Sequence, residues 1–369
     1  MPNIYRETQL LSKPLNGHTR LPRVSAEING QLIQSVLALT LHEAASHSPN
    51  SFDITINTSV DFQNHPWLHR YLGVVSVSIS IDDGESGTAP LLFKGLADHI
   101  SLDPLERKAR LRGRDNSAIL STSSPRLSFA NQTSSEIAKD IAARHGLVAR
   151  CFDTIDIVGS YRNGSYSQMF FTTHSQFKNE WDLLTSLAIH EDFELYMDGV
   201  ALVFSPISAL DTNIWPLSIS ELTNIKIQKV CALTDRIRLE VRSWNSDLNE
   251  ASYHIVNEAA DSTGIATSFP LEHLIVKPNM SQADIERLAQ RYISRFRKRQ
   301  SAIFVTMPAN NFIRTRDTLL LSGVGAGYDT RYLVDSVRRR FSPTVGFLQY
   351  IKASPIMSEP TASLYVGSA

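Results

Sequence analysis

The chain has 369 residues, of which 42% are hydrophobic and 20% charged, and its formal net charge is −1. A chain of this length can bury more than one core, and we expect two to four domains. The near-neutral charge gives no global electrostatic reason to expect a nucleic acid or an acidic membrane as partner. The two cysteines, Cys151 and Cys231, lie far apart in sequence, which argues against a disulfide framework or a zinc knuckle.

The sequence also lacks signals for export or membrane insertion. No run approaches the roughly 18 apolar residues that a membrane-spanning helix needs. Residues 1–10 lack the charged start and apolar middle of a signal peptide. We therefore expect no membrane-spanning segment and synthesis in a cytoplasm.

The first region is predicted to be rich in strands. Residues 24–28 and 36–41 alternate in polarity and flank Asn29-Gly30, a dipeptide that favours a hairpin turn because both residues tolerate positive φ. The alternation continues through residues 52–56 and 75–81. Residues from about 20 to 115 therefore predict an antiparallel barrel or sandwich, and we assign residues 1–115 to a first, tube-like β-barrel domain.

The second region mixes helix and strand signals. Thr133 and Glu136 have the spacing of a capping box, and Gly146 stands where a helix commonly ends. A second helix is predicted around Trp181, and Asp198-Gly199 marks a turn between two strands. Residues 116–212 are therefore expected to form an α+β insert domain.

The third region returns to strands. We expect residues 213–353 to form a second β-barrel that starts with a strand at 237–241 and is interrupted by one amphipathic helix at about 281–300. Residues 354–369 are polar with scattered prolines and are predicted to be a mobile tail. The overall fold class is thus α+β and rich in β, with a weak architectural duplication of the two barrels.

Basic residues form two groups that are candidates for a protein interface. Arg287, Arg291, Arg295 and Arg299 recur every four residues along the helix, which is consistent with a solvated face or with a docking surface for acidic loops of a neighbouring subunit or tube protein. A second group comprises Arg338, Arg339 and Arg340 at a predicted strand end; it could form an interface or simply face water.

Trp244 follows the strand at 237–241. It is either a core or domain-junction residue or an interface anchor, since tryptophan is enriched at hot spots.

Several motifs resemble catalytic or ligand-binding sites, but the residues around them do not provide the structure that such a site needs. The glycines of residues 323–327 lie between two predicted strands and open no helix, so a hairpin loop is expected rather than a phosphate site. His65 and His69 have no evident third metal ligand. No nucleophile elbow and no local carboxylate pair is found, although distant residues could still assemble one. We expect no catalytic residue, cofactor or metal.

The order of several motifs resembles the baseplate or tail hub family of contractile phages, also called the late control D family, which is similar to the hub part of type VI secretion spikes. Each motif alone is a turn or a cap, and the resemblance depends on their order over residues 20–353. The matching positions are Phe93-Lys94-Gly95, Leu111-Arg112-Gly113-Arg114-Asp115, Asn131-Gln132-Thr133 with Ile137-Ala138, Glu180-Trp181-Asp182-Leu183-Leu184, and residues 332–337 with Gly346-Phe347.

The resemblance implies a structural protein of a virion tail or baseplate, assembled in the host bacterial cytoplasm. It implies a homotrimeric symmetry adaptor in which six similar barrels meet a hexameric tail tube or its initiator, while other domains meet a trimeric spike and other baseplate proteins. No enzymatic activity and no nucleic-acid specificity are expected. The alternatives are a cell-wall hydrolase of the tail, which an acidic pair in one cleft would favour, and a carbohydrate-binding β protein, which an aromatic groove would favour.

Overall fold

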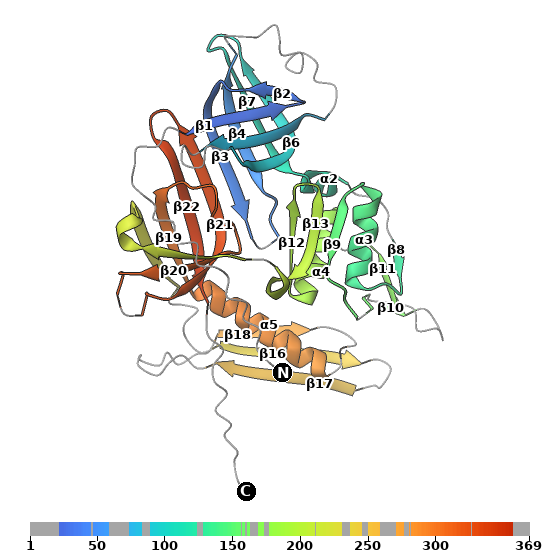
Figure 1. Cartoon of the computed structure of the whole chain (residues 1–369). Coiled ribbons are helices and arrows are strands. Elements are labelled where there is room, and N and C mark those ends of the chain that lie inside the picture. Colours follow the sequence, from blue (N-terminus) through green and yellow to red (C-terminus); the bar gives the residue numbers. More distant parts are fainter. Residues whose placement is uncertain are drawn as a thin grey trace.

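The computed structural model describes most of the chain (Figure 1). The described residues are 22–45, 47–58, 74–82, 89–123, 128–155, 157–158, 161–162, 169–172, 177–210, 212–230, 237–245, 250–258, 271–276, 280, 282–325 and 327–356. Within them, no helix is long and apolar enough to cross a membrane.

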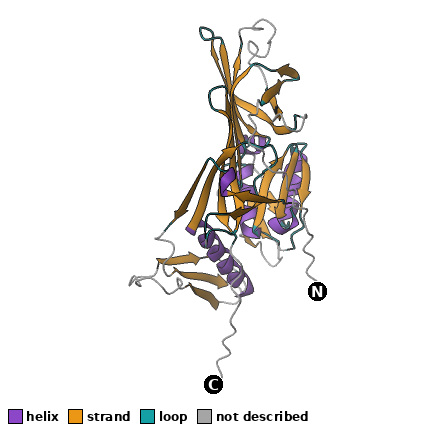
Figure 2. Cartoon of the chain, turned by 60° about the vertical axis from the view of Figure 1, so that its left-hand side comes forward, coloured by secondary structure: helices purple, strands orange, loops and turns teal. Residues whose placement is uncertain are grey.

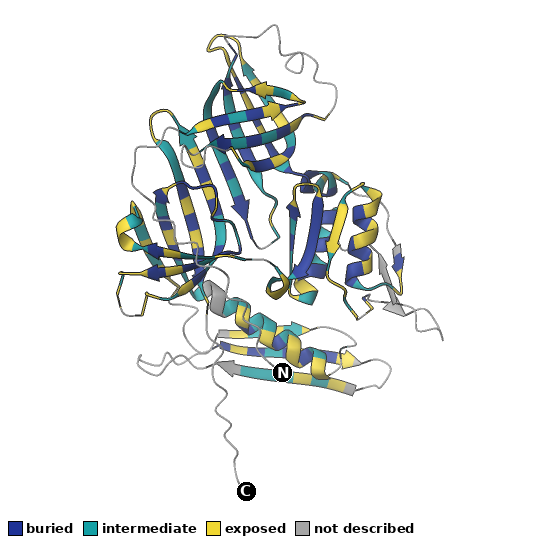
Figure 3. Cartoon of the chain, in the orientation of Figure 1, coloured by how far each residue is buried: buried dark blue, intermediate teal, exposed yellow. Residues whose placement is uncertain are grey.

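A first β unit is built by the strands that precede residue 116. Its core is formed by the alternating apolar residues, so that Ile54, Ile56, Ile79 and Ile81 have no exposed surface. Each such side chain contributes about 1.5–3 kcal/mol through removal from water. Figure 3 shows the resulting bands of buried and exposed residues along the strands. The strands are β1 (Arg23–Ile28), β2 (Gln31–Ile33), β3 (Val36–Ala44), β4 (Ser51–Asn57), β5 (Ser76–Asp82), β6 (Leu91–Asp103) and β7 (Lys108–Asp115).

The hairpin turn at Asn29-Gly30 is confirmed, but its second arm differs from the prediction. Asn29 and Gly30 have φ of 47° and 81°, and the turn joins β1 to the short β2. Residues 36–41 instead lie in β3, which pairs with β4 on one side. The two-residue turn thus fixes a local hairpin, while the longer alternating strand is used for a distant partner.

A second β unit is joined to the first in one 13-stranded sheet. The junction is β21 against β3, from Ser336 opposite Ala44 to Phe341 opposite Leu39, and Figure 1 shows these two strands side by side. The two expected barrels are therefore not separate bodies, and backbone pairing among the described residues closes neither unit into a ring. The strands of this unit are β14 (Ile214–Ser218), β15 (Asn224–Lys229), β19 (Ser301–Pro308), β20 (Thr318–Ser322), β21 (Arg331–Ser342) and β22 (Gly346–Pro355).

The end of β22 corrects the predicted start of the tail. Ser354 is buried and Pro355 still pairs with Tyr332. The remainder of the predicted mobile tail, residues 357–369, lies outside the described residues.

Four strands in each β unit follow the same order, although the pair β1 and β5 is antiparallel whereas β14 and β20 are parallel. In the sheet, β3-β4-β7-β6 of the first unit corresponds to β15-β19-β22-β21 of the second. Both fourth strands carry a bulge at an aspartate, between Ala97 and His99 in β6 and between Val334 and Ser336 in β21. A bulge bends its strand and increases the local twist. At the bulge β21 passes from β20 to β3, and β6 leaves β5.

An α+β insert follows the first β unit. Thr133 and Glu136 form the capping box of α3, worth about 1 kcal/mol, and Gly146 follows its end with φ of 65°. Trp181 and the leucines of α4 are buried in one core with apolar residues of β12 and β13. The elements are α2 (Ser117–Thr122), β8 (Ser128–Ala130), α3 (Ser134–Arg144), β9 (Val148–Cys151), β10 (Tyr161–Arg162), β11 (Met169–Thr172), α4 (Glu180–Glu191), β12 (Phe193–Asp198) and β13 (Ala201–Pro206).

A second insert separates β15 from β19, and it corrects the predicted content of the second barrel. The helix α5 (Gln282–Gln300) packs on a separate three-stranded sheet of β16 (Ile237–Asn245), β17 (Glu250–Glu258) and β18 (Leu271–Val276). The strand at 237–241 therefore belongs to this small sheet and not to a barrel. Figure 2 shows α5 lying on one face of it.

Candidate functional site and interaction surfaces

Eight consecutive strands of the large sheet form a continuous surface across both β units. Their order is β15-β19-β22-β21-β3-β4-β7-β6. One face packs on the two cores, and the other, called here the outer face, carries mostly polar side chains. On β7, for example, Ala109 and Leu111 are buried, whereas Arg110 and Arg112 are exposed.

Asp53 of β4 is the main acidic group at the centre of the outer face. Its carboxylate accepts hydrogen bonds from Arg110 Nη2 at 2.5 Å and from Arg112 Nε at 3.1 Å. Partial burial alone would raise its pKa, but the hydrogen bonds and positive charges of the two arginines hold the pKa of Asp53 below its ordinary value. One carboxylate thus serves two guanidinium groups, which leaves an excess of positive charge.

The eight-stranded path ends in two backbone edges with no partner among the described residues. β15 pairs with β19 on one side only. β6 pairs with β5 only as far as Leu96, so on that side residues 98–103 form a second edge. Unpaired strand edges are templates for pairing with another chain.

Two motifs that supported the resemblance meet across β6 and β7. Gly95 lies opposite Asp115, and Ala97 lies opposite Gly113. A Cβ atom on Gly95 would lie 2.1 Å from the carbonyl oxygen of Arg114, and one on Gly113 would lie 1.9 Å from that of Leu96. Glycine is required here because the two backbones approach too closely for any side chain.

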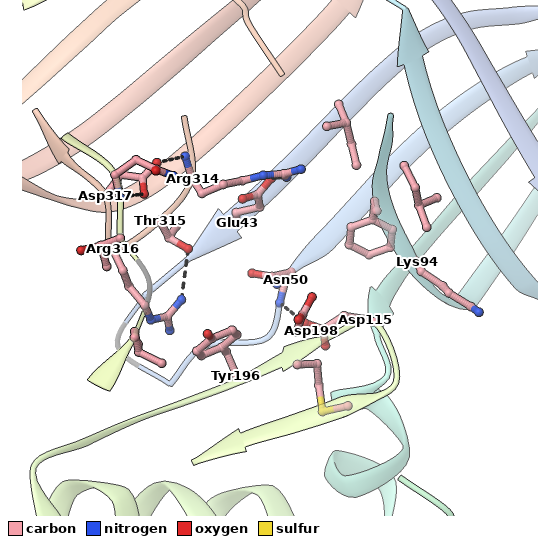
Figure 4. Close-up of a pocket in the computed structure, with 18 residues that line it drawn as sticks. Glu43, Asn50, Lys94, Asp115, Tyr196, Asp198, Arg314, Thr315, Arg316 and Asp317 are labelled. Atoms are coloured by element: carbon pink, nitrogen blue, oxygen red, sulfur yellow. Dashed lines mark hydrogen bonds and ion pairs between the residues drawn. The ribbon is translucent and has the colours of Figure 1, made fainter. Parts of the chain in front are cut away.

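A cavity of about 440 Å³ lies where the two β units and the first insert meet. Figure 4 shows its labelled residues converging from different elements: Glu43 from β3, Tyr196 and Asp198 from β12, and Arg314 and Arg316 from the segment before β20. Because several carboxylates line this cavity, it is the place to look for the pair of acidic residues that a cell-wall hydrolase would need.

The carboxylates that line this cavity all have internal partners. Glu43 Oε1 is 2.5 Å from Arg339 Nη1 and 2.9 Å from Arg314 Nη1. Asp115 accepts from Asn50 N and from Ser117, Asp198 from Arg150, and Asp317 from Trp215 Nε1 at 2.9 Å. Burial raises the pKa of both Asp115 and Asp317, against the effect of these hydrogen bonds. Glu43 thus joins the two β units, and each of the other carboxylates has a partner within or next to its own unit, so no unpartnered acid pair lines the cavity.

Arg316 links the second β unit to the insert. Its Nε donates to Glu194 Oε2 at 2.7 Å, and its guanidinium lies 4.0 Å from the ring centre of Tyr196. Arg316 is 5% exposed and has φ of 75°, a conformation that costs a non-glycine residue of order 1–3 kcal/mol. These contacts offset the strain, and the cation–π contact alone is worth about 2 kcal/mol when desolvated.

Two arginines of the predicted basic stripe of α5 bind the end of α4 in the same chain. Arg291 donates to the carbonyl oxygen of His190, and Arg295 Nη2 donates to that of Ile189 at 3.1 Å. These carbonyls belong to the last turn of α4, where a helix favours positive charge. Arg287 pairs with Asp284 in its own helix. Arg299 lies in α5, but its side chain is outside the described residues.

The arginines of β21 do not form one cluster, which corrects that prediction. They lie within the strand rather than at its end, and Arg338 and Arg340 are exposed on the outer face while Arg339 points inward and is fully buried. Besides Glu43, Arg339 donates to the carbonyl oxygens of Asn310 and Ile313. Arg339 thus joins the two β units, and only its two neighbours remain available to a partner.

Trp244 is 51% exposed, so it is not a core residue. It lies on the face of the small sheet that points away from α5, which also bears exposed Tyr253, Leu274 and Val276. Its role as an interface anchor stays a prediction.

The glycine-rich loop between β20 and β21 is closed by its own aspartate. Asp329 Oδ1 accepts from the backbone amides of Val324 at 2.9 Å and Gly325 at 3.3 Å. These amide hydrogen bonds lower the pKa of Asp329. The donors that a phosphate would need are thus already used, and the predicted hairpin loop is confirmed. His65 and His69 lie outside the described residues, which themselves contain no group of three metal-ligating side chains.

No family model and no curated protein matches the chain. Solved structures match its fold. The tail protein from Neisseria meningitidis MC58 has a TM-score of 0.67 at 14% identity, over 90% of this chain and 96% of that one. The chain has the fold of phage tail proteins.

Two further structures extend this likeness. The prophage MuSo2 43 kDa tail protein from Shewanella oneidensis has a TM-score of 0.67 at 15% identity, over 91% of this chain and 98% of that one. The E. coli c3393 protein, a type VI secretion component described as similar to bacteriophage T4 gp27 and gp5, has a TM-score of 0.57 at 12% identity, over 90% and 77%. The fold that the motif order implied is therefore the one found.

Several residues of these surfaces were not predicted from the sequence. Glu43, Asp53 and Arg316 stand alone in alternating strands or loops, where no motif distinguishes them. The single available signal was the polarity of Arg110, Arg112 and Arg114 at every second position of β7, which is typical of one exposed strand face.

Proposed function

We propose that the chain is a structural hub of a phage-type tail, which assembles into a homotrimeric ring by pairing β15 of one copy with residues 98–103 of β6 in the next. The observation that supports this most is the repeated topology. Within one chain the fourth strand of the second unit, β21, pairs with the first strand of the first unit, β3. In the repeat, β6 corresponds to β21 and β15 corresponds to β3. A second junction of the same kind would therefore pair β6 with β15, and both present unpaired edges among the described residues.

The internal junction predicts the register of the intermolecular one. The aspartate bulges align Asp98 with Asp335, and the core pairings align Leu41 with Ile227. Because Arg339 pairs with Leu41 and Arg340 with Thr40, the corresponding pairs between copies are Leu102 with Ile227 and Asp103 with Lys226.

The chemistry of these pairs suits an interface. Ile227 and Leu102 are only partly buried in the single chain, and each packs at the rim of its core, so pairing would complete both cores. Asp103 and Lys226 would place opposite charges directly across from each other on the outer face, which is favourable by about 0.2–1 kcal/mol.

Strand direction permits this closure. Every neighbour along the eight-stranded path is antiparallel, so β15 and β6 run in opposite directions. A copy related by rotation then brings its β6 antiparallel to β15, as a head-to-tail interface that closes into a ring. Three times eight strands give a ring about 37 Å across at about 4.8 Å per strand, before strand tilt widens it.

Such a ring would hold six similar β units around a threefold axis. The six units would meet a hexameric tail tube or its initiator, and the two inserts would meet a trimeric spike and other baseplate proteins. The ring would be part of a virion tail or baseplate, assembled in a bacterial cytoplasm. A structural rather than enzymatic role is supported by the carboxylates of the junction cavity, which all have internal partners.

A charge-swap experiment tests the proposed interface. We expect the full chain to have the mass of three copies by light scattering and to form rings in negative-stain images. Asp103→Lys should weaken the ring, so that single chains appear at a protein concentration where the wild type is a trimer, because the new lysine faces Lys226, and the double variant Asp103→Lys/Lys226→Asp should restore the ring. Glu106→Lys, three residues further on in the exposed turn after β6, is the matched control and should leave the mass unchanged. A single-chain mass for the wild type at high concentration, or no rescue by the swap, would refute the edge pairing.

A further inference from the structure

The outer face of the eight-stranded sheet is basic, although the chain as a whole has a net charge of −1. Its cationic side chains include Lys226 of β15, Lys352 of β22, Arg338 and Arg340 of β21, and Lys108, Arg110, Arg112 and Arg114 of β7. Of the acidic residues of the same strands, Glu43 and Asp115 are buried, and the others are Asp53, Asp98, Asp103 and Asp335.

The cations at the centre of this face are not neutralised. Arg338, Arg340 and Lys352 are exposed and form no ion pair with any described carboxylate. Burial lowers the pKa of His42, and the charge of the neighbouring Arg338 lowers it further, which outweighs the opposite effect of Glu43. Burial is the larger of the two causes, and the contribution of Arg338 is that of an unpaired positive charge beside the imidazole.

We infer that this outer face binds the phosphate backbone of a nucleic acid duplex without regard to sequence. A flat, exposed set of arginines on a sheet fits phosphate oxygens, because guanidinium groups bind them in bidentate fashion. Phosphate contacts position a protein on a duplex but carry no base information. The binding would thus be independent of sequence, and it goes beyond the sequence analysis, which gave no electrostatic reason to expect a nucleic acid as partner.

The composition of the face favours a nucleic acid over an acidic protein. The core of a stable protein interface is depleted of charge and carries buried apolar anchors. Here the central strands β21, β3, β4 and β7 present mostly charged, histidine and hydroxyl side chains, and the exposed aromatic residues are Tyr350, opposite Arg338 on the neighbouring strand β22, and Phe304 on β19. Two aromatic side chains do not form a platform on which the successive bases of a single strand could stack.

The spacing of the cations also suits a duplex. Arg338 and Arg340 lie on β21 and Arg112 lies on β7, three strands away. Three steps of about 4.8 Å separate these rows by about 14 Å. This is comparable to the roughly 12 Å width of the major groove, so the two rows can contact phosphates on both of its sides.

This inference goes beyond the ring, because the face is complete in a single chain. If the ring forms with the two hydrophobic cores on its outside, the outer face of the sheet would line the channel of the ring. Binding and ring formation can therefore be measured separately, and either can fail without the other.

The test is fluorescence anisotropy of the full chain with a labelled 30-base-pair DNA duplex at several salt concentrations. We expect micromolar binding that is equal for AT-rich and GC-rich duplexes and weakens steeply as salt rises. The double variant Arg338→Glu/Arg340→Glu should reduce the slope of log K against log salt by about 2, since each lost phosphate contact removes about 0.9. The matched control is Arg238→Glu/Arg242→Glu, which reverses two exposed arginines of the small sheet.

Three results would overturn the inference. These are no binding at 50 mM salt, equal losses in the two double variants, or tighter binding to poly-glutamate than to the duplex, which would point to an acidic protein instead. Light scattering of the same samples reports the ring independently. A ring that binds no duplex contradicts only this inference, whereas a single chain that binds duplex through Arg338 and Arg340 contradicts only the ring.

Discussion

Replacing Arg339 by methionine should destabilise the protein more than any neighbouring change on β21. Arg339 is fully buried, and its guanidinium lies 2.5 Å from Glu43 Oε1 and also binds two backbone carbonyls. Arg339→Met removes these donors and leaves Glu43 with Arg314 as its remaining charged partner. Breaking a buried ion pair in this way costs about 3–5 kcal/mol.

The assay is urea unfolding of the variant beside Arg338→Met, which lies one residue away on the exposed face. With a denaturant slope of about 3 kcal/mol per M, the midpoint of Arg339→Met should fall by about 1 M or more. Arg338→Met should stay within about 0.5 kcal/mol of the wild type. Adding Glu43→Gln to Arg339→Met should cost less than the sum of the two single changes, because the two residues act as one pair. Equal midpoints for Arg338→Met and Arg339→Met would refute the assignment of Arg339 as the link between the β units.

Three further outcomes follow from the contacts described. Gly113→Ala should cost more than about 3 kcal/mol in urea unfolding, because its Cβ would meet a backbone oxygen of β6; a near-neutral change would contradict the close approach. Arg291→Glu with Arg295→Glu should speed hydrogen exchange in the last turn of α4, and unchanged exchange would mean that the stripe does not hold that helix end. His42 should stay neutral to lower pH than an ordinary histidine, so unfolded chains take up the proton first and stability falls as pH drops below about 6.5. Arg338→Gln should raise the His42 pKa in an NMR titration, and no shift would exclude Arg338 as a cause.

Local features of the fold could be predicted from the sequence because they depend on neighbouring residues. The capping box at Thr133, the left-handed Gly146 and the Asn29-Gly30 turn are each fixed by side chains and φ angles within a few positions. The apolar face of α4 follows from helical spacing alone. The repeated architecture followed from counting strands and turns.

The pairings between distant strands could not be predicted in this way. The junction of β3 with β21 joins residues almost 300 positions apart, and nothing local to Leu39 or Phe341 identifies the partner. For the same reason the strand at 237–241 was assigned to a barrel, although its partners form a separate sheet.

The three arginines were grouped because they were placed at a strand end, whereas the strand continues through them and the bulge at Asp335 sets which of them points inward. Simple alternation from Tyr332 and Val334 would bury the even-numbered residues, including Arg338. The bulge shifts the pattern by one residue, so Val337 and Arg339 point inward instead. A one-residue shift of this kind decides which arginine is structural and which two face a partner.

The most direct test of the ring is a disulfide cross-link in the predicted register. Ser101 and Gln228 correspond to Arg338 and His42 of the internal junction, so Ser101→Cys with Gln228→Cys should bridge adjacent copies once Cys151 and Cys231 are replaced by serine. The account predicts that oxidation gives a product of three chains that grows no further on a non-reducing gel. A series of cross-linked products with more than three chains, or single chains alone, would contradict the edge-to-edge ring.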